Sequence, residues 1–296
     1  MTDNTKLQLG LERLTIAVFC LLFLLGCGNS SDISQEERHY IEQLEKTEEL
    51  FKSNPNDYKA WNDKGTNLLE LGRYQEALES FDKAIEIKPD FHGALLYKGV
   101  ALVNLGLYQQ AIKSYDKGIE IKPDFHDAWY GKGLVFVRLG QYEEAVPFFE
   151  KAVEIEPNFM EAWNNKGATL LRTGNYQEAV NSYNQAIQIS PINPYSWSGK
   201  GEALLLSGQY NEAIKCFEKV VKIKPDYYEA WLNTGVAFFQ LGRYKEALKP
   251  LEKAIETQPS DYRAWVNKCV ILRKLNSDQE ATYVCEQADK LVNLAQ

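Results

Sequence analysis

The side chains that could act as nucleophiles, bases or metal ligands are few in this sequence. Its 296 residues include five cysteines and three histidines. No two cysteines form a CxxC pair, so the spacing predicts neither a zinc site nor a thioredoxin-like redox motif. No Ser-His-Asp or Cys-His set stands in a recognisable motif, and no glycine-rich phosphate loop follows a strand pattern. We therefore expect no enzymatic activity, no bound metal and no cofactor.

Two histidines, His92 and His126, lie 34 residues apart, and each follows the segment KPDF. Their equivalent places allow two interpretations, a pair of metal ligands or two solvated residues in loops between helices. The loop interpretation is favoured, because the acidic residues near them belong to a recurring segment of the chain.

The charge of the chain limits its partners. The formal net charge is −8, and 25% of the residues are charged. Nucleic acids and anionic membrane surfaces attract clustered lysine and arginine, so this balance argues against both as charge-driven partners. The most acidic stretch, residues 34–52, carries six glutamates against three basic residues. It is interpreted as the solvated face of a helix, with an acidic docking tail as the alternative.

An apolar run near the N-terminus has a different character. Residues 14–25 read LTIAVFCLLFLL, without a charge. A membrane-spanning helix needs about 20 apolar residues, so this run is too short. Its length suits the apolar core of an export signal, with Lys6 and Arg13 as the basic flank.

The end of this run, LLGC at residues 24–27, resembles the processing box of bacterial lipoproteins. The resemblance implies that the Cys27 thiol receives a diacylglyceryl group and that the chain is cut before it. Residues 1–26 would then be the signal peptide and residues 27–34 a polar spacer. The protein would be a lipoprotein of the cell envelope, facing the periplasm or the exterior. An uncleaved signal-anchor and an incidental apolar N-terminus remain as alternatives.

A pattern of 34 residues recurs through the rest of the chain. Each repeat has a large residue, a small residue four places later, an alanine sixteen places later and, in six repeats, a proline near its end. The large residues are Trp61, Leu95, Trp129, Trp163, Trp197, Trp231 and Trp265, and the small ones Gly65, Gly99, Gly133, Gly167, Gly201, Gly235 and Cys269. The alanines are Ala77, Ala111, Ala145, Ala179, Ala213, Ala247 and Ala281, and the prolines Pro89, Pro123, Pro157, Pro191, Pro225 and Pro259.

Each repeat predicts two helices. Over residues 57–72 the apolar and small residues follow helical spacing, and Gly72 is placed to end the helix. A second helix follows, and Pro89 stands just past its end, where proline blocks further helix. The small residues Gly65 and Ala77 would let the two backbones approach closely, with Phe81 filling the space beside them.

This pattern resembles the tetratricopeptide repeat (TPR), which has the same period and signature. The resemblance implies an all-α, right-handed superhelical solenoid of helix-turn-helix hairpins. Residues 35–57 would form an N-terminal capping helix and residues 58–261 six regular repeats. Residues 262–296 would form a degenerate seventh repeat and the C-terminal cap, as solenoid ends require polar outer faces.

The resemblance also implies that partners lie along a concave groove lined by the first helix of each repeat. At the corresponding places, asparagines would hydrogen-bond an extended peptide backbone, since amide side chains both donate and accept. An apolar middle would form a contact surface, with coverage by neighbouring helices as the alternative. The predicted groove residues are Asn62, Tyr97, Val100, Tyr130, Leu134, Asn164, Asn165, Asn233, Asn267 and Arg273.

Two cysteines occupy places that the resemblance brings face to face within the last repeat. Cys269 stands at the small place of the first helix, and Cys285 at the aromatic place of the second. A disulfide that closes this repeat and a pair of buried free thiols both remain open.

Together these patterns predict a non-catalytic adaptor or scaffold. It would be exported, anchored to a membrane by lipid, and would bind partner proteins or peptides in its groove, with a role in assembling envelope complexes. Two alternatives remain: a structural, self-assembling repeat protein, and a carrier of a glycan or lipid in the groove.

Overall fold

The computed structural model describes residues 34–295, and all regular secondary structure in that range is helical. The helices of the first five hairpins and the helix before them are α1 (Gln35–Ser53), α2 (Tyr58–Glu70), α3 (Tyr74–Ile87), α4 (His92–Asn104), α5 (Tyr108–Ile121), α6 (His126–Arg138), α7 (Tyr142–Ile155), α8 (Met160–Arg172), α9 (Tyr176–Ile189), α10 (Pro194–Leu206) and α11 (Tyr210–Ile223). The last two hairpins are α12 (Tyr228–Gln240), α13 (Tyr244–Thr257), α14 (Tyr262–Lys274) and α15 (Asp278–Ala295). The predicted all-α class and the predicted order of helix pairs are confirmed.

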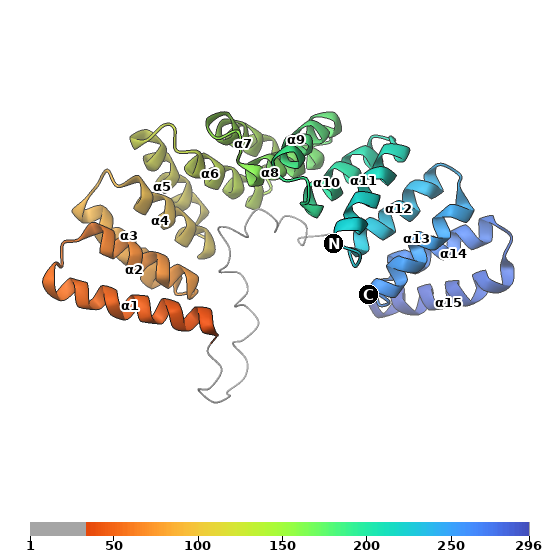
Figure 1. Ribbon diagram of the computed structural model, residues 1–296, viewed down its shortest axis with the longest axis horizontal. Coiled ribbons are helices and arrows are strands. Elements are labelled where there is room, and N and C mark those ends of the chain that lie inside the picture. The colour runs from red at the N-terminus through yellow and green to blue at the C-terminus, as the bar shows by residue number, and fades with distance from the viewer. Residues whose placement is uncertain (1–33, 296) are drawn as a thin grey trace. The chain divides into compact units, whose positions relative to one another are not determined.

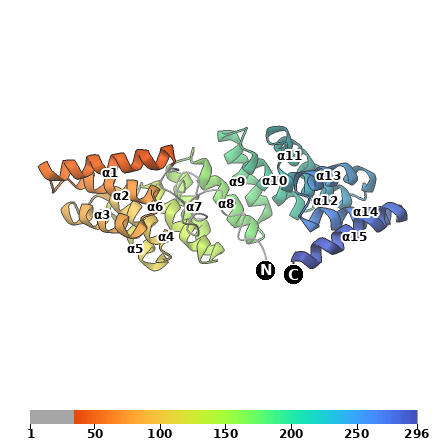
Figure 2. The ribbon, with the colours of Figure 1, turned by 90° about the horizontal axis from the view of Figure 1, so that it is seen from below.

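The chain divides into two compact units, one ending at Asn165 and one beginning at Lys166. In the first unit each helix from α1 to α7 packs on the next, so the hairpins stack in chain order (Figure 1). In the second unit the same holds from α9 to α15. Figure 2 shows α1 lying along α2, whose outer side it covers at the start of the first unit. The predicted signal peptide and Cys27 lie outside the described residues.

The turn inside each hairpin depends on one backbone conformation. Gly72 has a φ of 69°, a region that side chains disfavour. There the Arg73 amide donates to the Leu68 carbonyl at 2.8 Å, which closes the end of α2. The last hairpin has Asn276 at this place, with a φ of 56°. Asparagine tolerates the left-handed region better than most residues, so the degenerate repeat keeps the same turn.

The loop between hairpins is held by the recurring tryptophan. In the first repeat the Trp61 indole nitrogen donates to the Pro55 carbonyl at 2.9 Å. The same bond forms from Trp129, Trp163, Trp197, Trp231 and Trp265, each to the proline six residues earlier. The bond explains why tryptophan and proline keep a constant spacing, because each ring fixes the loop that precedes its own helix.

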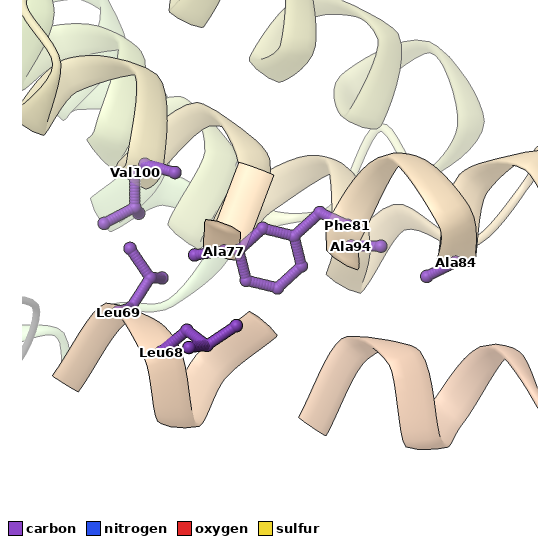
Figure 3. Close-up of a cluster of buried hydrophobic side chains, with 8 residues drawn as sticks. Leu68, Leu69, Ala77, Phe81, Ala84, Ala94 and Val100 are labelled. Atoms are coloured by element: carbon purple, nitrogen blue, oxygen red, sulfur yellow. The ribbon is translucent and has the colours of Figure 1, made fainter. Parts of the chain in front are cut away.

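In five of the seven hairpins the core contains an aromatic ring set against a glycine, whereas Leu251 meets the glycine in α12–α13 and a disulfide takes this place in the last hairpin. Phe81 of α3 is fully buried, and a Cβ added at Gly65 of α2 would lie 2.4 Å from the Phe81 ring. Only a glycine lets the two helices approach this closely. In Figure 3 the Phe81 ring lies at the centre of a cluster that includes Leu68, Ala77 and Ala94. Because Ala94 belongs to α4, the cluster joins one hairpin to the next.

Ion pairs tie successive hairpins together. A lysine in the first helix of a repeat contacts a carboxylate sixteen residues earlier, in the second helix of the hairpin before or in α1. The pairs are Lys64–Glu48 (2.5 Å), Lys98–Asp82 (2.5 Å), Lys132–Asp116 (2.6 Å) and Lys268–Glu252 (3.0 Å). Such partly exposed pairs contribute roughly 0.2–1 kcal/mol each, so they adjust the stacking more than they create it.

The last hairpin contains a covalent link. Cys269 of α14 and Cys285 of α15 form a disulfide, with the two Cα atoms 5.0 Å apart. The bond lies in a small cluster with Leu272, Ala281 and Val284. None of the helices in the described range combines the length and the apolar character needed to cross a membrane.

Candidate interaction surface

The first helices of the hairpins form a continuous face within each unit. Contacts join α2 to α4 and α4 to α6 in the first unit, and α10 to α12 and α12 to α14 in the second. Successive second helices, such as α3 and α5, lie farther apart. The first helices therefore occupy the inner side of each stack, and we call this side the first-helix face.

Tyr97 of α4 is the aromatic centre of this face in the first unit. Its ring stacks on Phe81, with centroids 6.0 Å apart and planes 18° from parallel, and its side chain is half-buried. Burial raises the pKa of Tyr97, and three carboxylates, those of Asp127, Glu70 and Asp63, raise it further. These carboxylates come from two first helices, α2 and α6, so the face gathers negative charge around one partly exposed ring.

Asn62 and Glu70 of α2 add buried acceptor atoms to the same face. Asn62 Oδ1 and Glu70 Oε2 are shielded from solvent and have no hydrogen-bond partner among the described residues. Burial also raises the pKa of the Glu70 carboxyl. Buried acceptors without partners are costly, and a donor group from a ligand would relieve that cost.

Three of the predicted groove residues lie in the core. Tyr130 is 1% exposed, Asn165 4% and Val100 9%. The Asn165 amide donates to the Tyr130 hydroxyl at 3.0 Å, and Phe149 and Phe159 pack against the Tyr130 ring. These side chains therefore do not face an open groove, and the alternative of coverage by neighbouring side chains holds for them: Phe149 and Phe159 cover Tyr130, and Val100 lies in the cluster around Phe81.

The remaining predicted residues of the first unit are accessible in part. Leu134 is half-buried against the Tyr130 and Phe149 cluster, and Asn164 is half-buried on α8. Together with Asn62 and Tyr97, these two residues form a surface that is more polar than the sequence alone suggested. The apolar middle consists mainly of core residues.

In the second unit the predicted residues are spread over two helices. Asn233 of α12 and Asn267 of α14 are half-buried, and Arg273 of α14 is exposed. The Asn267 amide donates to the Arg263 carbonyl one turn earlier, at 2.9 Å. This bond uses one of its two N–H groups, so the side chain retains an acceptor and one donor for a partner.

Sequence reasoning missed two features of this face. Asp127 was not assigned to the groove, although it stands at the second place of its repeat, where such residues belong. On α14, Tyr262, Val266 and Val270 are 40%, 37% and 39% exposed, one helical turn apart. Their four-residue spacing was a readable signal of one helix face, but no role was assigned to them.

The histidines serve packing. The His92 ring lies edge-on to Phe125, with centroids 4.9 Å apart, and the His126 ring lies edge-on to Phe159 at 5.3 Å. Burial lowers the pKa of His92, and the charge of Lys122 adds to this effect. Within residues 34–295 no group of three or more His, Cys, Asp or Glu side chains is arranged to hold a metal ion.

Several solved structures share this fold. YrrB, a TPR protein with an unusual peptide-binding site, is 24% identical, covers 63% of this chain with 96% of its own, and has a TM-score of 0.53. A tetratricopeptide repeat protein from Parabacteroides merdae is 17% identical, with 79% and 93% covered and a TM-score of 0.58. MamA is 24% identical, with 54% and 94% covered and a TM-score of 0.53. Comparison with curated proteins finds no significant match.

The repeats themselves match family models. One model of the tetratricopeptide repeat matches residues 42–92, 62–124 and 198–262. A second model with the same description matches residues 126–159 and 161–193. The matched segments extend over most of the described helices and follow the period seen in the structure. The chain therefore belongs to the tetratricopeptide repeat family.

Proposed function

We propose that this protein is a non-catalytic scaffold that holds an extended segment of a partner protein along the first-helix face. The observation that carries the proposal is the half-buried Tyr97, set among carboxylates from α2 and α6, with buried acceptors of Asn62 and Glu70 beside it. A surface with unpartnered hydrogen-bond acceptors can bind a peptide whose groups supply hydrogen-bond donors. The peptide-binding site of YrrB supports the same use of the fold.

The negative charge of this face favours a partner segment with positively charged side chains. Asp63, Glu70 and Asp127 surround Tyr97, so a segment with lysine or arginine side chains gains both ion pairs and a cation-π contact. Exposed ion pairs are screened by salt, so the affinity should fall as ionic strength rises.

Site-specific crosslinking tests the proposal. A photoreactive amino acid at position 63 lies on the first-helix face, and one at the exposed Lys117 of α5 provides the control on a second helix. We expect crosslinks from position 63 to basic segments of a small set of proteins, identified by mass spectrometry. An Asp127→Asn substitution in the same chain should weaken them several-fold. Equal crosslinking from both positions would contradict the proposal.

We further propose that the chain is exported and held at a membrane of the cell envelope through a lipid on Cys27, where it assists the assembly of envelope complexes. The apolar run and the LLGC box support this assignment. Tethering would raise the local concentration of a bound partner near the membrane.

Metabolic labelling with a fatty-acid analogue tests the anchor. We expect label on the wild type and on a Cys20→Ser variant, and none on Cys27→Ser. Label that persists in the Cys27→Ser variant would show that the lipid is attached elsewhere and would contradict the assignment to Cys27.

A further inference from the structure

The second unit contains a cavity that does not belong to the first-helix face. It lies among α9, α10 and α11, which are neighbours in Figure 1, and its volume is about 460 Å³. Its apolar lining comes from Val180, Trp197, Leu204 and Cys216, and its charged lining from Lys200, Lys215, Lys219 and Glu212. Cavities of roughly 300–1,000 Å³ are of the size that binds ligands.

The side chain at one place distinguishes this hairpin from the α6–α7 hairpin. Two repeats earlier, Phe148 stands at the place of Cys216 and stacks on Trp129, with centroids 6.2 Å apart and planes 25° from parallel. In the α10–α11 hairpin Cys216 cannot reach across, so one side of Trp197 lines open space. The Trp197 ring is held by its bond to the Pro191 carbonyl at 2.8 Å, so the wall of the cavity is fixed in position.

Lys200 at the cavity lacks the carboxylate partner that the equivalent lysine has in other repeats. Lys200 occupies the place of Lys64, Lys98 and Lys132, but the residue sixteen places earlier is Asn184 and not a carboxylate. Among the described residues Lys200 therefore forms no ion pair, and its Nζ lies 5.5 Å from the Trp197 ring centroid.

A second carboxylate is replaced on α11. In three other repeats the lysine at the place of Lys219 pairs with a glutamate three residues later, as in Lys83–Glu86 (2.7 Å) and Lys151–Glu154 (3.0 Å). In α11 the later residue is Lys222, so Lys219 has no such partner. In a chain with a net charge of −8, this is a local concentration of unpaired positive charge beside an apolar cavity.

We propose that this cavity binds an acidic peptide segment of a partner protein. One bulky apolar side chain of the segment fills the space beside Trp197, and neighbouring carboxylates meet Lys200, Lys215 and Lys219. The three cations are distributed over α10 and α11, which suits several carboxylates along a chain better than a single anionic headgroup. The site is separate from the first-helix face and opposite to it in charge, so one molecule can hold two unlike segments.

Selection from a random peptide library on the purified full chain tests the proposal. We expect enriched peptides to combine aspartate or glutamate with a phenylalanine, tryptophan or leucine. The affinity of the best peptide, labelled with a fluorophore, is then measured by anisotropy. Enrichment of peptides without this composition would overturn the proposal.

Matched charge reversals locate the site. Lys215→Glu with Lys219→Glu should weaken the peptide by at least about tenfold, because attraction becomes repulsion at two contacts. The control pair, Lys249→Glu with Lys253→Glu, makes the same change at the equivalent exposed places of α13 and should leave the affinity within about twofold. Equal losses in both pairs would show unspecific charge attraction and would overturn the proposal.

A substitution that fills the cavity tests the importance of its shape independently of its charge. Cys216→Phe places a ring where Phe148 stands in the earlier repeat, and it should abolish binding while circular dichroism shows an intact fold. Cys216→Ser, which matches Ser80, Ser114 and Ser182 at this place, should retain binding. Peptide binding to a folded Cys216→Phe variant would contradict the proposal.

A lipid ligand is a distinct outcome of the same experiments. If vesicles of phosphatidylglycerol bind with the same dependence on Lys215 and Lys219 and displace the peptide, the cavity is a lipid site and the peptide assignment is wrong. Either result leaves the proposed binding at the first-helix face unaffected, because none of the residues on that face is changed in these variants.

Discussion

At the scale of single residues, close packing in the first six hairpins depends on the missing Cβ of one glycine in each first helix. A Cβ at Gly65 would lie 2.4 Å from the Phe81 ring, whereas a Cβ at Gly118 has its nearest neighbour, Leu95 Cβ, at 3.8 Å. The first distance is a clash and the second is ordinary van der Waals contact. Both glycines lie inside helices, so the same substitution has opposite consequences at the two sites.

Alanine at these two places should therefore change stability in opposite directions. Gly118→Ala should stabilise the chain by about 0.5–1 kcal/mol, because alanine loses less entropy in a helix. Gly65→Ala makes the same gain but must displace a packed ring, which costs typically 1–3 kcal/mol, so we expect a net loss. Urea unfolding followed by circular dichroism measures both, and equal shifts in the midpoint would contradict this account.

At the scale of elements, the last hairpin differs from the others in what holds it. Its tight turn uses Asn276 in place of glycine. The Cys269–Cys285 disulfide joins its two helices across 16 residues of chain. Disulfides persist in oxidising compartments, so this link supports the proposed location in the envelope.

Removing the disulfide should loosen this hairpin and leave the others unchanged. Closing a loop of about 15 residues contributes roughly 3 kcal/mol, so Cys269→Ala with Cys285→Ala should destabilise α14 and α15 locally. Hydrogen exchange by mass spectrometry should show faster exchange in these helices and unchanged exchange in α2 and α3. Unchanged exchange in α14 and α15 would show that packing alone holds the hairpin.

At the scale of the whole molecule, buried tyrosines make both units sensitive to alkali. Tyr115 and Tyr130 of the first unit and Tyr183 of the second have pKa values raised far above the ordinary value, mainly by burial. Burial raises the pKa of Tyr227 to about 12. In the unfolded chain these hydroxyls would ionise near pH 10.

Because the folded pKa values are higher, the unfolded state loses these protons first as the pH rises. The free energy of unfolding should be independent of these tyrosines below about pH 9 and fall above about pH 10. We expect helix loss and the rise in absorbance at 295 nm from these tyrosines to occur together in an alkaline titration. Complete tyrosine ionisation with the helices intact would contradict the burial of these rings.

The sequence by itself determined the local structure of this protein. The 34-residue period, the glycines and the prolines are sufficient to predict every hairpin, because helix boundaries and turns depend on residues that are close in the chain. The constant spacing of tryptophan and proline is also visible in the sequence, although its cause, the indole bond to the proline carbonyl, required the structure.

Only the tertiary structure decided which side chains are available to a partner. Tyr97 and Tyr130 both stand on first helices, yet Tyr97 is stacked on one side by Phe81 while Tyr130 is enclosed by Phe149, Phe159 and Asn165. Periodicity places a residue on a face of its helix. Whether that face is covered depends on the size of side chains from other helices, and in the same way Phe148 stacks on Trp129 whereas the smaller Cys216 lines a cavity beside Trp197.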